Sequence, residues 1–588
     1  MISYRIDVAD VHAHLFRVTI RIPRPAAEQR LSLPVWIPGS YLVREFARHL
    51  SGLKASQGDR DLALQQLDKA TWLARCNGRG VLVLSYLVYA FDTSVRTAYL
   101  DARRGFFNGT GVFLRVHGRE GDAHAMHIGT LPSGWEVATA MPPGPHKHCF
   151  VAADYDALVD HPVEMGTFWR GRFDAAGVAH EFVVAGAPPG FDGQQLLADA
   201  KRICETEIAF WHGGDACARD VPFERYVFML NLVEDGHGGL EHRASTALIA
   251  ARRDLPRQGA TERSDGYVNL LGLISHEYFH TWNVKRLRPA GFDRLDYTQE
   301  NYTELLWFFE GFTSYYDDLL LVRAGLIDET RYLKLVAKTA SAVLATPGRK
   351  LQSLAEASFD AWVKYYRSDE NTPNATISYY AKGALVALAL DLRLRSAGRR
   401  GASLDRVMRS LWARSGGGPI SEADILAAVA DVAGAHGAAL ADELQAWVHG
   451  TDDLPLPDLL ARAGVRWQAQ APTLAQRWGL RVSESALAGV KISHVLRGSA
   501  GEQAGLAAGD ELLAVEGWRV RRLDDAAALV SEGTPAQLLV SRDQRVLSLK
   551  LDAAARSASE AGQGTVQLAV DDSAGRAARA LRRAWLAA

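Results

Sequence analysis

The amino-acid sequence predicts a multidomain α+β protein. At 588 residues the chain is far longer than one hydrophobic core can organise, so three or more domains are expected. Residues 1–165 carry β-branched and aromatic runs that partly alternate, whereas helical periodicity dominates much of 166–455. Hydrophobic residues make up 48% of the chain and charged residues 23%, which is ordinary globular composition.

Charge and cysteine content argue against several classes of protein. Lys and Arg number 66 against 68 acidic residues, a balance that favours neither nucleic acid nor an anionic membrane as a partner. The cysteines lack C-x-x-C spacing, so we expect neither a disulfide framework nor a cysteine zinc site: Cys76, Cys149, Cys204 and Cys217. The start, "MISYRIDVAD", does not resemble a signal peptide, and no apolar run reaches about 18 residues. A cytoplasmic location without a membrane span is expected.

Residues 1–165 are predicted to form a β-sandwich-like domain. "HLFRVTIRIP" (14–23), "GVLVLSYLVYAF" (80–91) and "GVFLRV" (111–116) have strand composition, with Gly and Pro between them. "LPVWIPGSYLVREFARHL" (33–50) interrupts the pattern with an aromatic loop and then a possible short helix. The sequence gives no firm role to the Tyr and Arg residues of this stretch: Tyr41, Arg44 and Arg48.

Residues 166–455 are predicted to form an α+β catalytic unit. "QQLLADAKRICETEIAFWHG" (194–213) has apolar residues at helical spacing, and "YVFMLNLV" (226–233) has strand composition. Long helical segments are expected near 264–286, 300–325, 329–345, 378–398 and 420–449. Strands followed by a mostly helical half are typical of α+β architecture.

The last part of the chain is predicted to hold a small separate domain. A Pro-containing connector covers about 451–475. Short strands around a Gly-rich centre, with one helix, follow at 476–555. The remaining residues, 556–588, contain a basic amphipathic helix candidate, "AGRAARALRRAWLAA", that is either docked or frayed.

"LISHEYFHTW" (273–282) carries the strongest chemical signal. His276 and His280 are four residues apart, so on a helix they present two imidazoles on one face, as Zn²⁺ takes them from an H-E-x-x-H pattern. Glu277 lies beside the first histidine and could take a proton from a water that zinc activates. The alternative is a pair of structural histidines.

A third protein ligand is needed if water is to occupy the fourth position of the metal. "ELLWFFEGFTSYYDDLLLV" contains Glu310 as an isolated acid in an apolar run, where a carboxylate is costly unless it is paired or bound to metal. Glu310 is therefore the predicted ligand. Three other acids compete with it, in more polar surroundings or off its helical face: Glu304, Asp317 and Asp318.

H-E-x-x-H followed by "WFFEGFTSYY" (307–316) resembles the gluzincin aminopeptidases. The longer strings "SHEYFHTWNVKRLRP" and "WIPGSYLVREFAR" are similar to the glycyl aminopeptidase family in particular, and the resemblance runs from about residue 30 to 555. It implies a thermolysin-like catalytic domain at 166–455, a PDZ domain at 476–555, one Zn²⁺ per chain and a preference for small N-terminal residues, Gly and Ala.

The resemblance also implies substrate-binding residues. "GGLEHR" (238–243) is similar to a strand whose Glu anchors the substrate's free α-ammonium, which maps to Glu241, with Gly238 and Gly239 beside the substrate. "SYYAKGALVAL" (378–388) is similar to a helix start whose Tyr donates to the oxyanion, which maps to Tyr380; Tyr379 is the adjacent rival. Without the resemblance, Glu241 would more often be a surface acid.

"RWGLRV" and "GSAGEQAGLAAGDELLAVEGWRV" resemble a PDZ carboxylate-binding loop and core. Gly505 and Gly509 suit positive-φ turns, and Asp510 would stabilise that turn. Such a domain captures C-terminal peptides, or it serves only as a structural lid. The sequence thus predicts a zinc aminopeptidase acting on peptides with a free N-terminus. The alternatives are a zinc endopeptidase that recruits protein tails through the PDZ domain, and a non-catalytic peptide-binding scaffold.

Overall fold

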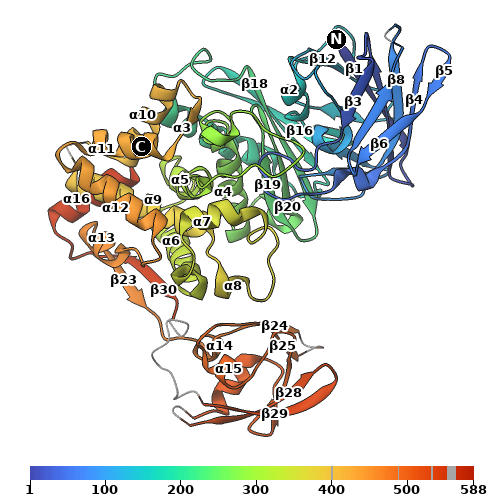
Figure 1. Cartoon of the computed structure of the whole chain (residues 1–588). Helices are drawn as coiled ribbons and strands as arrows, with labels where there is room; N and C mark the ends of the chain where they lie inside the picture. Colours follow the sequence, from blue (N-terminus) through green and yellow to red (C-terminus); the bar gives the residue numbers. More distant parts are fainter. Residues whose placement is uncertain are drawn as a thin grey trace. The chain divides into compact units, whose positions relative to one another are not determined.

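The computed structural model describes residues 1–77, 79–398, 401–485, 487, 489–531, 534–552 and 564–587. The chain divides into two compact units: Met1–Asn301 with Gly417–Pro419, and Tyr302–Gly416 with Ile420–Ala588. The first unit contains a β-rich N-terminal part and a mixed sheet with its own helices. The second unit contains most of the helices of the chain and a small β domain (Figure 1).

The N-terminal part is rich in β-strands, as predicted. Its sheets have the orders β14-β12-β1-β2-β8-β4-β5, β13-β15-β10-β9 and β11-β3-β7-β6. In β8, alternate residues from Leu82 to Val88 are buried, which is the period expected of a strand with one face on the core. The strands are β1 (Ile2–Asp10), β2 (Leu15–Ile22), β3 (Glu28–Ser32), β4 (Leu50–Gln57), β5 (Arg60–Leu62), β6 (Leu64–Asp68), β7 (Thr71–Arg75), β8 (Leu82–Tyr89), β9 (Ala98–Leu100), β10 (Arg104–Phe107), β11 (Arg115–Val116), β12 (His124–Ile128), β13 (Glu136–Ala138), β14 (Cys149–Ala152) and β15 (Val163–Gly166).

The strand predicted at 111–116 is largely wrong. A helical turn, α1 (Gly109–Val112), occupies its start, and only Arg115–Val116 pair as β11. Tyrosine hydroxyls replace a neighbouring strand here: Tyr86 donates to the carbonyl oxygen of Val112 over 2.6 Å, and Tyr155 to that of Phe113 over 2.8 Å. Buried carbonyl groups can therefore be satisfied without a sheet. The short helix expected after the aromatic loop is η1 (Phe46–His49).

The rest of the first unit builds a five-stranded sheet in the order β16-β17-β18-β20-β19. β17, β18 and β20 run parallel, while β19 pairs antiparallel with β20 and forms the sheet edge. Helix α4 packs beside β19 (Figure 1). The elements are β16 (Phe168–Ala175), β17 (Val178–Ala185), α3 (Gly193–His212), β18 (Arg225–Val233), β19 (His237–Glu241), β20 (Ser245–Ala251) and α4 (Asp265–Phe279).

Helix α4 is shorter than the predicted segment 264–286. Ser264 caps it by accepting a hydrogen bond from the backbone N–H of Tyr267, and His280 is its C-cap. The chain then turns, with the N–H of Lys285 donating to the carbonyl oxygen of His280 and Val284 at φ 127°. Backbone hydrogen bonds of this turn replace those of a further helical turn. The spacing of apolar residues in the sequence does not reveal such bonds, so the predicted helix was too long.

The second unit is mainly helical around α9, which is buried along most of its length. The predicted helix at 300–325 begins only at Trp307, and its first turn is a π-helix. The helices are η4 (Trp307–Gly311), α5 (Thr313–Arg323), α6 (Glu329–Leu344), α7 (Leu354–Phe359), α8 (Thr372–Ala375), α9 (Tyr379–Ala397), α10 (Leu404–Ser415), α11 (Glu422–Ala433), α12 (Gly437–His449), α13 (Leu456–Arg462) and α16 (Arg576–Leu586).

The predicted helix at 420–449 is divided. By length and composition alone, Glu422–His449 could cross a membrane, with a mean hydropathy of 1.3. Gly434, at φ 70°, ends α11 and the chain continues as α12, which packs against α11. A break at a positive-φ residue makes this segment two packed helices, not one continuous span.

The small β domain has its own hydrophobic core, which includes Trp478, Ile492 and Val540. Gly505 and Gly509 have φ of 81° and 93°, as predicted. Asp510 stabilises the turn by accepting from the N–H of Ala507 over 2.9 Å. The elements are α14 (Leu474–Trp478), β24 (Leu480–Ser485), β25 (Gly489–Val495), α15 (Ala500–Gln503), β26 (Glu511–Val515), β27 (Trp518–Arg519), η8 (Leu523–Ala528), β28 (Ala536–Arg542) and β29 (Arg545–Leu551).

The end of the chain returns to the helices. β30 (Val566–Val570) pairs with β23 (Val465–Ala469), and α16 is docked, not frayed. Trp585 is fully buried and its indole N–H donates to the hydroxyl of Tyr315 over 3.0 Å. Residues 556–563 and 588 of the predicted tail lie outside the described residues.

Candidate metal centre and active site

Helix α4 ends in the two predicted histidines. The Nε2 atoms of His276 and His280 lie 3.0 Å apart. Nδ1 of His280 lies 2.8 Å from the carbonyl oxygen of Asn283, which can only accept, so Nδ1 carries the proton and Nε2 presents its lone pair. A hydrogen bond from the second ring nitrogen to a carbonyl is the arrangement that orients metal-binding histidines.

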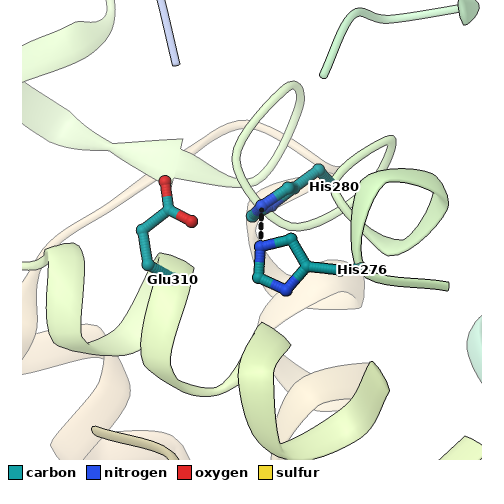
Figure 2. A group of neighbouring side chains, drawn as sticks. All are labelled: His276, His280 and Glu310. Atoms are coloured by element: carbon teal, nitrogen blue, oxygen red, sulfur yellow. Dashed lines mark hydrogen bonds between the residues drawn. The ribbon is translucent and has the colours of Figure 1, made fainter. Parts of the chain in front are cut away.

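Glu310, the predicted third ligand, belongs to the same group of potential metal-binding side chains. One ligand atom from each of His276, His280 and Glu310 lies within 4.8 Å of the others (Figure 2). Glu310 is 2% exposed and lies in the π-helix η4. Two imidazoles and one carboxylate are a donor set that zinc takes in catalytic sites, so these residues fit the ion. Among the residues that the structure describes, the competing acids are not part of this group: Glu304, Asp317 and Asp318.

Strand β19 passes directly over Glu277. A β-carbon on Gly239 would lie 2.1 Å from Oε1 of Glu277, so only glycine allows this approach. Arg96 fixes the strand there by donating to the carbonyl oxygen of Gly239 over 3.1 Å. Because alternate residues share one face of a strand, Glu241 points the same way as Gly239. The predicted proton acceptor and the predicted amine anchor therefore share one side of β19.

Glu241 is buried without a counter-charge. It is 4% exposed, yet within the described ranges its carboxylate has neither a hydrogen bond nor an ion pair. It lines a pocket together with Gly39, Tyr41 and Phe292. A buried, unpaired carboxylate is costly, which favours a cationic ligand at this position.

Basic side chains of the same pocket are engaged elsewhere. Nζ of Lys285 lies 2.7 Å from Oδ1 of Asp160, and Nδ1 of His242 lies 3.3 Å from the same oxygen. Burial raises the pKa of Asp160, but the charge of Lys285, the hydrogen bond from His242 and the charge of Arg243 together outweigh burial and hold that pKa well below its usual range. Asp160 and Lys285 thus form a pair that leaves Glu241 free of Lys285. Neither Asp160 nor Lys285 was assigned a role from the sequence.

Tyr380 lies at the start of α9, where Ser378 accepts from the N–H of Ala381 as N-cap. Its hydroxyl is 3.4 Å from that of Tyr366. Burial, followed by the negative charge of Glu310, raises the pKa of Tyr380 well above its usual value, so the phenol keeps its proton and can donate. The rival, Tyr379, is fully buried, whereas Tyr380 is partly exposed.

Comparison with known proteins places the chain in a family. Residues 3–167 match the Peptidase M61 N-terminal domain, 269–386 match M61 glycyl aminopeptidase, and 491–542 match a PDZ domain. A solved aminopeptidase N family protein from Idiomarina loihiensis is 35% identical, with a TM-score of 0.92 and coverage of 100% of both chains. The chain belongs to the M61 glycyl aminopeptidase family.

A more distant match is the M1 zinc metallopeptidase of Deinococcus radiodurans, at 17% identity and a TM-score of 0.47, covering 78% of this chain and 95% of that one. No curated protein matches the sequence. As an M61 family member the protein is a metallopeptidase with a PDZ domain, and the scaffold alternative is set aside.

Proposed function

We propose that the protein is a zinc-dependent aminopeptidase that removes small N-terminal residues, Gly and Ala, from peptides. The observation that carries this proposal is the buried, unpaired carboxylate of Glu241 on the same face of β19 as the residue that contacts Glu277. A free α-ammonium group is the one cation that every peptide substrate of an aminopeptidase brings. The preference for Gly and Ala is supported by the glycyl aminopeptidase family match.

His276, His280 and Glu310 would hold the zinc ion, one per chain. Zinc held there supplies a Lewis acid for the scissile carbonyl and lowers the pKa of water toward about 7. Asn283 keeps the proton of His280 on Nδ1, so that Nε2 remains available as a ligand.

Glu277 is the proposed proton carrier. Its carboxylate takes a proton from the attacking water and passes it to the leaving amine, which must be protonated to depart. Gly239 leaves this carboxylate room beside β19. Tyr380, protonated by virtue of its raised pKa, donates to the oxygen on which negative charge develops.

Glu241 is the proposed anchor of the substrate. Its carboxylate binds the α-ammonium group, and Gly238 and Gly239 run beside the substrate backbone. An N-acylated peptide would leave Glu241 buried without a cation, and this penalty discriminates against internal peptide bonds. The PDZ domain is proposed to bind C-terminal peptide segments.

A panel of aminoacyl anilides tests the function. We expect cleavage of glycyl and alanyl anilides that a chelator abolishes and zinc restores. N-acetylglycyl anilide should not be cleaved. Glu277→Gln should retain zinc by elemental analysis while kcat falls by roughly 10²–10⁴-fold. Cleavage of the N-acetylated substrate would identify an endopeptidase instead, and normal turnover by Glu277→Gln would contradict the proposed chemistry.

A further inference from the structure

The aromatic loop of the N-terminal part (Val35–Arg44) is held rigidly against the chain that follows the histidine motif. The backbone N–H of Val35 donates to the carbonyl oxygen of Tyr297 over 2.9 Å, and the indole N–H of Trp36 donates to that of Asp296 over 2.7 Å. These bonds join two segments that are far apart in the sequence. The loop therefore cannot swing away without losing both hydrogen bonds.

Internal bonds close the same loop. The N–H of Arg44 donates to the carbonyl oxygen of Val35 over 2.7 Å, and the guanidinium of Arg44 donates to Oγ of Ser40 over 2.7 Å. The N–H of Ser40 donates to the carbonyl oxygen of Ile37 over 3.1 Å. This turn presents Gly39 at φ 90°, a conformation that L side chains rarely adopt.

Gly39 lies directly on the carboxylate of Glu241. A β-carbon at Gly39 would lie 2.4 Å from Oε1 and 2.5 Å from Oε2 of Glu241. Both oxygens face the bare backbone of the loop, so the loop forms a wall at the end of the carboxylate. Gly39 and Glu241 line the same pocket.

The basic residues of this pocket already have acidic partners. Lys285 pairs with Asp160 at 2.7 Å, and Arg288 pairs with Asp293 at 2.9 Å. Arg243 lies 3.9 Å from Asp160. Glu241 is therefore left for a cationic ligand, and the wall at Gly39 limits what can accompany that ligand's nitrogen.

We propose that Gly39 determines specificity at the amine subsite, and that the loop Val35–Arg44 excludes any carbon substituent on the substrate's α-nitrogen. The subsite takes a primary α-ammonium group. It rejects both acylated and N-alkylated termini on steric grounds, and acylated termini also because they lack the positive charge. This inference rests on the proposed function, because it assumes that Glu241 binds the substrate amine.

A substrate pair separates the wall from charge recognition in the unaltered protein. Glycyl and N-methylglycyl anilides both carry a cationic nitrogen, but the second adds one methyl group. We expect kcat/KM for the N-methylglycyl substrate to be at least tenfold lower, mainly through KM. Equal kcat/KM values would overturn steric exclusion by the loop, but would not contradict the role of Glu241 as the charge partner of the amine.

A pair of glycine substitutions tests Gly39 itself. Gly39→Ala places a methyl group on the Glu241 carboxylate, and we expect kcat/KM for glycyl anilide to fall at least tenfold. Gly80→Ala is the matched control: Gly80 lies in the same domain at φ 92°, so the backbone strain is similar, but its β-carbon would meet nothing closer than 3.7 Å. Similar kcat/KM values for the two variants would overturn the assignment of Gly39.

Combined variants distinguish this inference from the proposed function. Glu241→Asp withdraws the carboxylate and leaves room for the added methyl group. In the Gly39→Ala background it should therefore reduce kcat/KM by a smaller factor than in the unaltered protein. If Glu241→Asp reduces kcat/KM by the same factor in both backgrounds, the direct contact between positions 39 and 241 is overturned. If Glu241→Gln leaves the KM of glycyl anilide unchanged, the proposed function fails as well; if it raises KM but Gly39→Ala matches its control, only the role of Gly39 fails.

Discussion

Gly311 and Gly383 bring the backbones of two helices into contact. A β-carbon on Gly311 would lie 2.6 Å from the α-carbon of Gly383, and one on Gly383 would lie 2.9 Å from the α-carbon of Gly311. Gly311 follows Glu310 in η4, and Gly383 lies one helical turn after Tyr380 in α9. The contact thus sets the spacing between a proposed metal ligand and the proposed oxyanion donor.

Gly383→Ala should destabilise the protein and weaken metal binding. Alanine is a better helix former than glycine, but its methyl group would also lie 2.7 Å from the carbonyl oxygen of Trp307, where rigid backbone cannot yield. Overpacking of this kind costs about 1–3 kcal/mol. Urea denaturation measures the loss, and elemental analysis the zinc content.

Gly214→Ala is the control for this substitution, because a β-carbon at Gly214 would meet nothing within 4 Å. If Gly383→Ala is as stable as this control and binds as much zinc, the helices do not depend on the glycine contact.

Lys382 gives a pH-dependent prediction. It is 2% exposed, and Nζ has no hydrogen-bond partner within the described ranges. Burial lowers its pKa from 10.5 to about 8, so between pH 8 and 10.5 the unfolded chain binds a proton that the folded protein does not, and stability rises with pH. The depression corresponds to about 3 kcal/mol of penalty at neutral pH.

Lys382→Met should therefore be more stable than the unaltered protein at pH 7, and this advantage should shrink as the pH rises from 8 to 10. Urea midpoints at pH 7, 8.5 and 10 measure the trend. An advantage that stays constant over this range would show that the lysine does not carry the penalty.

Zinc should stabilise the folded protein through the three proposed ligands. A ligand that binds only the folded state adds about 2.7 kcal/mol to the free energy of unfolding at 100 times its dissociation constant. We expect zinc to raise the melting temperature of the unaltered protein and of Glu277→Gln, but not of His280→Ala. An equal increase in His280→Ala would place the metal elsewhere.

Asn374 holds the PDZ domain to the helical part of its unit. Its side-chain amide donates to the carbonyl oxygen of Val495 over 2.9 Å and accepts from the N–H of Arg497 over 2.8 Å. Asn374→Ala should therefore speed hydrogen exchange at the Arg497 amide. Asn371→Ala, at an exposed position of the same segment, should leave that amide protected. Unchanged exchange in Asn374→Ala would argue against a stable clamp.

Local patterns in the sequence were enough to predict which side chains meet at the candidate metal site. His276 and His280 follow from helical spacing, and Glu310 from its isolation in an apolar run; the structure groups all three. Gly505 and Gly509 likewise follow from local backbone demands. Each of these signals lies within a few residues, where side-chain type constrains geometry directly.

Features that depend on distant contacts were missed. The pair Asp160–Lys285 joins residues from different parts of the fold, and nothing local marks either residue. The contact of Gly39 with Glu241 is similar: the sequence showed a glycine in an aromatic loop but not what it faces. The end of α4 at Phe279 depends on the turn that follows, in which Val284 adopts φ 127°.

The π-helical turn of η4 has a consequence for chain length in this stretch. The turn at Trp307–Gly311 is wider than that of an α-helix, because π-helical hydrogen bonds join residue i to residue i+5 in place of i+4. Removing one residue here would let the turn close to α-helical winding, so that Glu310 would project at a different angle relative to α5. Deletion of Phe308 or Phe309 would thus turn Glu310 away from His276 and His280 even though every side chain proposed to act in catalysis remained, so in this turn the number of residues matters as much as their identity.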